Sequence, residues 1–188
     1  MHYKAFSGGM MLHTGYVFGG KSTVYDAHHN FIGSKEMKGT PWGIGGVLRF
    51  HFGKHLRIGT EGYSTNLQYG KNGSFVQLGW GGFLMDCQWI IEKFTLFVGG
   101  TLGGGGVKNL TLLDNSHTDF VEEGHATYRK YGVGLLTPFM GFEYAVTPKL
   151  HLIVKLDYIM NITNPQPDFV TGPRIYFGVL FCRERKSL

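Results

Sequence analysis

The segment from Leu150 to Met160 alternates in polarity. Every second residue is apolar or aromatic, and the intervening positions include His151, Lys155 and Asp157. A period of two is that of a β-strand, whose successive side chains point to opposite faces. A two-faced segment of about ten residues is the unit of a transmembrane β-barrel. This feature indicates where the protein resides more clearly than what it does there.

The same unit recurs and predicts eight strands. They span residues 6–18, 41–52, 56–69, 75–87, 94–106, 128–145, 150–160 and 175–181. The apolar parity changes within 56–69, which predicts a β-bulge near Gly62. Pro138 cannot donate a ladder hydrogen bond, so we expect a bulge or a local break there. In the strand at 75–87 we expect an outward apolar face made of Val76, Leu78, Trp80 and Leu84.

The connections between these strands alternate in length. Short turns follow the second, fourth and sixth strands, whereas residues 19–40, 107–127 and 161–173 form long connections, and 69–74 is a short exception. An even number of antiparallel strands with short turns at one end and long loops at the other is typical of outer-membrane barrels.

Composition excludes several other classes. Across 188 residues without a composition break, which predicts a single domain, only 16% are charged, below the roughly 25% of soluble domains. No apolar run reaches the 18 or more residues of a membrane helix, so only strands could cross a bilayer. The net charge of +5 is not gathered on a basic face with stacking aromatics, so we expect no nucleic-acid partner. The glycine run at 99–106 lacks the ending of a phosphate loop, and we expect no cofactor.

A period of two also fits a soluble lipocalin-like barrel that binds a small apolar ligand. Membrane barrels and soluble barrels both alternate in polarity, and only the direction of the apolar face differs. Glycines and long charged residues share the polar parity here, which suits the narrow interior of an eight-stranded barrel and favours a membrane barrel. We therefore expect Leu152, Val154, Phe177 and Val179 to face outward, with Lys155 and Arg174 inside.

The closing segment Ile175–Phe181 alternates aromatic and small residues. It resembles the final strand of the small eight-stranded outer-membrane barrels of Gram-negative bacteria, the outer-membrane protein A and X type. It departs from them by continuing through Cys182 to Leu188. The resemblance covers nearly the whole chain as a pattern. It implies insertion in the outer membrane, with membrane lipid, lipopolysaccharide and the barrel-assembly machinery as partners, but no activity. No signal peptide opens the chain at Met1, and we expect that a leader has been removed.

Three groups of polar residues are candidates for sites. Unpaired charges in a narrow lumen are costly, so the inward set should pair into a plug that closes the barrel, the alternative being a narrow ion path. This set comprises Arg49, Arg57, Glu61, Glu143, Lys155, Asp157 and Arg174. Carboxylates and imidazoles of two loops could hold a divalent cation or bind an external partner, although solvated polar loop residues are the favoured explanation. These are Asp26, His28, His29, His117, Asp119, Glu122, Glu123 and His125. Neither loop has the spacing of a known metal-ligand signature, which favours solvated residues.

The third group concerns catalysis. Some small outer-membrane barrels modify lipids with Ser and His, so His13, His51 and His151 with Ser7 or Ser64 are candidates for a lipid A-modifying enzyme. No G-x-S-x-G motif is present, and strands alone do not fix the geometry of a triad. We therefore expect an integral, non-enzymatic outer-membrane barrel with a closed lumen, acting structurally or through its external loops.

Overall fold

Ten strands make up the computed structural model, which describes residues 3–25, 28, 30–70, 73–113 and 126–184. Eight form a closed antiparallel barrel in the order β1-β10-β9-β8-β7-β6-β5-β4, and β2 and β3 form a separate two-stranded sheet. The barrel strands are β1 (Tyr3–Gly15), β4 (Trp42–Phe52), β5 (Leu56–Tyr69), β6 (Ser74–Ile91), β7 (Phe94–Leu112), β8 (Ala126–Thr147), β9 (Leu150–Asn161) and β10 (Gly172–Glu184). The predicted fold, an all-β, eight-stranded antiparallel barrel, is confirmed.

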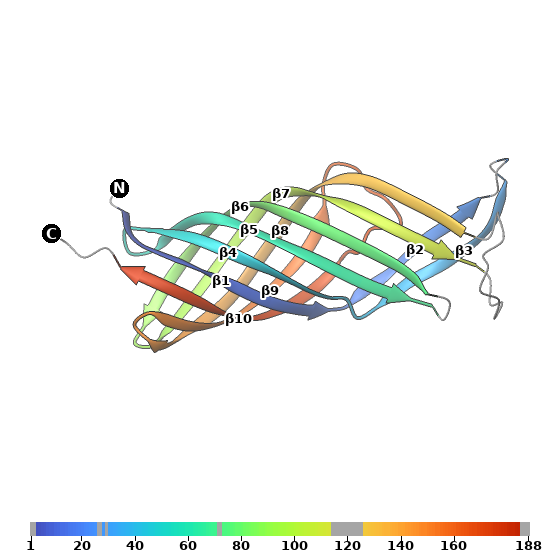
Figure 1. Ribbon diagram of the computed structural model, residues 1–188. Helices are drawn as coiled ribbons and strands as arrows, with labels where there is room; N and C mark the ends of the chain where they lie inside the picture. Colours follow the sequence, from blue (N-terminus) through green and yellow to red (C-terminus); the bar gives the residue numbers. More distant parts are fainter. Residues whose placement is uncertain (1–2, 26–27, 29, 71–72, 114–125, 185–188) are drawn as a thin grey trace.

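Both chain ends lie at one end of the barrel, together with the short turns (Figure 1). These turns occupy residues 53–55, 92–93 and 148–149. The barrel closes where β1 pairs with β10 on one side and with β4 on the other. No helix in the described residues is long and apolar enough to cross a membrane.

The long first connection is not a loop. Residues 19–40 lie largely in a β-hairpin of β2 (Val17–Tyr25) and β3 (Phe31–Gly39), which extends from the end of the barrel opposite the chain termini (Figure 1). Gly39 joins the hairpin to the barrel wall with a φ of 150°, a conformation that favours glycine. The sequence pattern predicts a first strand that ends at Phe18 and a loop after it, so it does not reveal this hairpin.

Two local predictions have different outcomes. β5 pairs with β6 in unbroken register from Leu56 to Tyr69, so the predicted bulge near Gly62 is wrong. The pairing of β8 with β9 omits Thr137 and Pro138 and resumes in the same register at Phe139, which is the predicted local break without a bulge.

The outward face predicted for β6 is also wrong. Val76, Leu78, Trp80 and Leu84 are buried, each at most 6% exposed, whereas Phe83 is 72% exposed. Polarity misleads here because the part of the lumen nearer the hairpin is filled with apolar side chains, so the apolar parity of β6 points inward.

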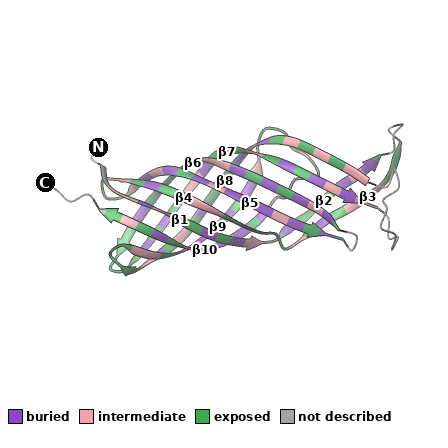
Figure 2. Ribbon diagram, viewed as in Figure 1, coloured by how far each residue is buried: buried purple, intermediate pink, exposed green. Residues whose placement is uncertain are grey.

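The exterior of the barrel is predominantly apolar. Buried and exposed positions alternate along its strands (Figure 2). Leu152 and Phe177 are 48% and 52% exposed, whereas Lys155 and Arg174 are 0% and 2% exposed. This outward apolar face is confirmed, and it contradicts a soluble lipocalin-like barrel, whose interior would hold these apolar side chains.

Candidate functional site

The lumen near the short turns holds a buried cluster of four charges. Glu143 Oε1 accepts hydrogen bonds from Arg49 Nη1 at 2.8 Å and Arg57 Nη1 at 2.7 Å. Arg57 Nε donates to Asp86 Oδ1 at 2.5 Å, and Arg49 Nε lies 3.3 Å from Asp86 Oδ2. Both guanidinium groups also lie over the ring of Phe97, at 4.7 and 4.9 Å from its centroid. Two positive charges thus face two negative charges without access to water.

A second buried cluster is centred on Lys155. Its Nζ donates to Glu61 Oε2 at 2.8 Å and lies 3.5 Å from Asp157 Oδ2. The ammonium group also lies 4.3 Å from the ring centroid of Tyr176 and 4.9 Å from that of Tyr63. The aromatic faces supply cation–π attraction where water is excluded. This cluster couples β5, β9 and β10 across the lumen.

Arg174 departs from the expected pairing. Its guanidinium donates to Thr65 Oγ1 at 3.1 Å and to the Val170 carbonyl at 3.3 Å. Among the described residues no carboxylate lies within ion-pair distance of it. Thr65 Oγ1 also lies 3.0 Å from His13 Nε2.

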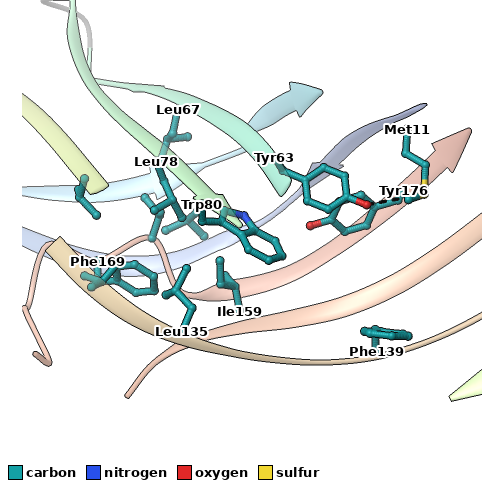
Figure 3. Close-up of a cluster of buried hydrophobic side chains, with 14 of the residues drawn as sticks. Met11, Tyr63, Leu67, Leu78, Trp80, Leu135, Phe139, Ile159, Phe169 and Tyr176 are labelled. Carbon is teal, nitrogen blue, oxygen red and sulfur yellow. Dashed lines mark hydrogen bonds between the residues drawn. The ribbon is translucent and has the colours of Figure 1, made fainter. Parts of the chain in front are cut away.

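An apolar layer follows toward the hairpin end of the barrel. Figure 3 shows Leu67, Leu78 and Trp80 approaching Leu135 and Ile159 from facing strands. Phe169 and Val170, from the segment between β9 and β10, are buried in the same layer. A layer of packed apolar side chains above buried charges opposes the entry of hydrated ions.

Asn109 of β7 connects two segments that cover the mouth of the barrel. Its Nδ2 donates to Ser22 Oγ of the hairpin at 3.2 Å and to Asp168 Oδ2 of the β9–β10 segment at 3.0 Å. Its Oδ1 accepts from Tyr69 OH at 2.7 Å. Asp168 in turn pairs with Arg129 Nη1 at 3.0 Å. A single amide side chain therefore bonds to both covering segments.

Lys35 adds a further contact between the hairpin and the barrel rim. Its Nζ donates to the Leu112 carbonyl at 3.0 Å and to Ser74 Oγ at 3.1 Å. Burial against the rim lowers the pKa of this amine.

All seven residues of the expected lumen set are buried in the interior. Sequence reasoning missed Asp86, which completes the Arg49–Arg57–Glu143 cluster. The cause is the misread parity of β6, because Asp86 shares a face with Leu84 and Trp80. The strand register could have revealed Asp86, since Asp86 lies directly opposite Arg57 on the neighbouring strand.

Little of the proposed loop site is described. His28 is exposed in the turn between β2 and β3. Asp26, His29, His117, Asp119, Glu122, Glu123 and His125 lie outside the described residues. Within the described part of the chain, no group of three or more His, Cys, Asp or Glu residues is placed to hold a metal ion.

The candidate catalytic residues separate into two environments. Ser7 Oγ lies 2.9 Å from His51 Nε2 inside the lumen, and His151 Nδ1 lies 3.6 Å from Glu143 Oε2 nearby. Ser64 instead faces outward on β5 and is exposed. Ser7 is 0% exposed, so the barrel wall separates its hydroxyl from any acyl ester in the surrounding lipid.

The chain matches no protein-family model and no curated protein sequence. Solved structures with a similar fold are known. The outer membrane protein OprG of Pseudomonas aeruginosa gives a TM-score of 0.68 at 10% identity, covering 97% of each chain. Neisserial surface protein A gives 0.54 at 14% identity, covering 96% of this chain and 97% of that one. Ail of Yersinia pestis, in complex with the heparin analogue sucrose octasulfate, gives 0.54 at 12% identity, covering 97% and 100%.

Together, the closed barrel, its apolar exterior and these similarities define the class. The chain has the fold of the small eight-stranded outer-membrane β-barrels. Its outward side chains are predominantly apolar and suited to hydrocarbon, and the seven charged residues of the lumen set are enclosed, as in an integral outer-membrane barrel.

Proposed function

We propose that this protein is a non-enzymatic outer-membrane barrel with a closed lumen, which acts as a structural or surface-interaction protein through its hairpin and external loops. The observation that carries the proposal is the packing of charged clusters and an apolar layer inside the lumen. Because eight strands leave a bore that side chains can fill, this interior serves as a plug. Contacts with an external partner are then made by the surface that lies outside the membrane.

The hairpin is suited to such a role. Its outward side chains include Phe18, Tyr25 and Phe31, which are 62%, 48% and 62% exposed. Aromatic side chains contribute strongly to protein interfaces because they bury a large area with few rotatable bonds. The hairpin and the external loops are therefore the proposed contact surface for an external partner. Lipopolysaccharide and other membrane lipids are the proposed surroundings, and the barrel-assembly machinery is the proposed insertion partner.

Planar-bilayer recording on the refolded full chain tests the plug. A closed lumen predicts no steady conductance above that of the lipid alone. Trp80→Ala, which removes the largest side chain from the apolar layer, should increase the frequency of brief openings. Steady openings of the unmodified protein in most insertions would contradict the closed lumen.

Mass spectrometry of lipid A tests the non-enzymatic assignment. Lipid A from cells that express the protein and from cells that carry Ser7→Ala should be identical. Loss of an acyl chain or gain of a group only with the unmodified protein would refute that part of the proposal.

A further inference from the structure

Two lysines lie side by side on the outer surface of the barrel, above its apolar part. Lys108 of β7 and Lys130 of β8 are direct register partners, and both are exposed. Like charges directly opposite each other on neighbouring strands destabilise a sheet. Among the described residues, no carboxylate lies within ion-pair distance of either lysine. The pair is thus a concentrated positive charge that the described fold does not neutralise.

The surface below this pair changes in an ordered way. Three successive rows of register partners cross β6, β7 and β8 beneath the lysines. They are Gly79–Gly106–Gly132, then Gly81–Gly104–Gly134, then Phe83–Leu102–Leu136. An apolar row is therefore followed by two rows without side chains and then by the cations.

The glycines of the upper row are not required by crowding within the chain. A Cβ added at Gly79 or Gly106 would meet nothing within 4 Å, and one at Gly132 would meet only the Gly105 carbonyl oxygen at 3.9 Å. The strands here are extended, and none of these three glycines has a positive φ. The upper row thus exposes bare backbone just below the cationic pair, whereas in the lower row the Thr163 side chain covers Gly134, whose N–H donates to Thr163 Oγ1 at 2.6 Å.

The height of the lysines matches a lipid headgroup. Lys108 lies fourteen residues beyond Phe94, where β7 begins, and a strand tilted by about 40° rises roughly 35 Å over that length. The apolar band of an outer-membrane barrel is about 25 Å tall. With Phe94 taken as the lower edge of that band, the backbone at Lys108 lies about 10 Å beyond the hydrocarbon, on the side where the hairpin extends.

We propose that Lys108 and Lys130 bind a phosphate of a phosphorylated glycolipid in the outer leaflet. The sugar lies against the upper glycine row, and the acyl chains lie against Phe83, Leu102 and Leu136. Charge complementarity selects this occupant, since a lysine pair attracts phosphate and the rows below suit first a flat polar ring and then hydrocarbon. The inference rests on the proposed membrane location but not on the closed lumen.

Native mass spectrometry of the refolded full chain in neutral detergent tests the site. The probes are bis-phosphorylated lipid A and the same lipid after enzymatic dephosphorylation. K108Q/K130Q should weaken binding of the phosphorylated lipid roughly thirtyfold, because each lysine near an anionic surface contributes about a factor of five. The matched control K54Q/K149Q removes two exposed lysines of the short turns and should bind as the unmodified protein does.

A second variant tests the glycine face. Gly106→Leu has room for its side chain and should weaken binding while both lysines remain. Heat-modifiable migration and recovery in the outer-membrane fraction report insertion separately, so a failed site and a failed membrane assignment are distinguishable. Equal binding of both lipids, or equal loss in the control, would overturn the proposal. Sucrose octasulfate is a third probe: if K108Q/K130Q lost binding to it while lipid A binding was unchanged, the site would take a soluble polyanion and the proposal would be overturned.

Discussion

Replacing Glu143 with Gln should strongly destabilise the barrel. The carboxylate faces Arg49 and Arg57, both 0% exposed, and Asp86 supplies the other negative charge of the cluster. The variant therefore leaves two buried cations facing one anion. Removing one partner of a buried ion pair costs about 3–5 kcal/mol, mostly from the uncompensated charge.

Urea unfolding of the refolded protein in phosphatidylcholine vesicles, followed by tryptophan fluorescence, measures this cost. Glu36→Gln is the matched control, because its only ion pair among the described residues is with Lys38 on the surface, and such pairs contribute about 0–1 kcal/mol. Arg49→Gln combined with Glu143→Gln restores charge balance, so the double variant should lose less stability than the sum of the two single variants. A cost for Glu143→Gln no larger than that of Glu36→Gln, or strictly additive effects, would refute the pairing argument.

Two further predictions concern the mouth and the outer face. Asn109→Ala removes the amide that donates hydrogen bonds to Ser22 and Asp168. Hydrogen exchange in β2 and in residues 162–171 should therefore become faster, while exchange in the part of the barrel near the short turns is unaffected. Unchanged exchange in both segments would show that Asn109 does not hold them. Leu156→Arg places a charge on the outward face of β9, where Leu156 is 49% exposed, and should cost about 2–4 kcal/mol in vesicles. Gln68→Arg, outward at the rim end of β5, should cost about 0–1 kcal/mol, and equal costs for the two would contradict the membrane position of this face.

The barrel could be predicted from sequence because most strands segregate polarity by face. β9 and β10 are the clearest cases, since Leu152 and Phe177 face outward while Lys155 and Arg174 face inward. The seven charged residues of the lumen set share the inward parity of their strands for the same reason, and all seven are buried.

The inward face of β6, the contacts of Arg174 and the hairpin could not be predicted, because they depend on the three-dimensional structure. In β5 and β6 the inward face changes from charged to apolar, as Arg57 and Glu61 give way to Leu67 and Leu78, so polarity alone could not assign the parity. The contacts of Arg174 were equally hidden, because Val170 reaches it from a connection that sequence reasoning treated as an external loop. The hairpin was missed because its strands lie outside the barrel and alternate weakly.

Quenching of single tryptophans by brominated lipid tests the orientation of the barrel surface most directly. Trp42 and Trp89 are 62% and 48% exposed on the exterior, whereas Trp80 is 6% exposed inside the lumen. Three variants, each keeping one tryptophan and carrying Phe at the other two positions, would be refolded into vesicles with brominated acyl chains. The structure predicts strong quenching of Trp42 and Trp89 and little quenching of Trp80. Quenching of Trp80 by the lipid, with Trp42 and Trp89 quenched only by aqueous acrylamide, would contradict a barrel whose apolar exterior faces the membrane.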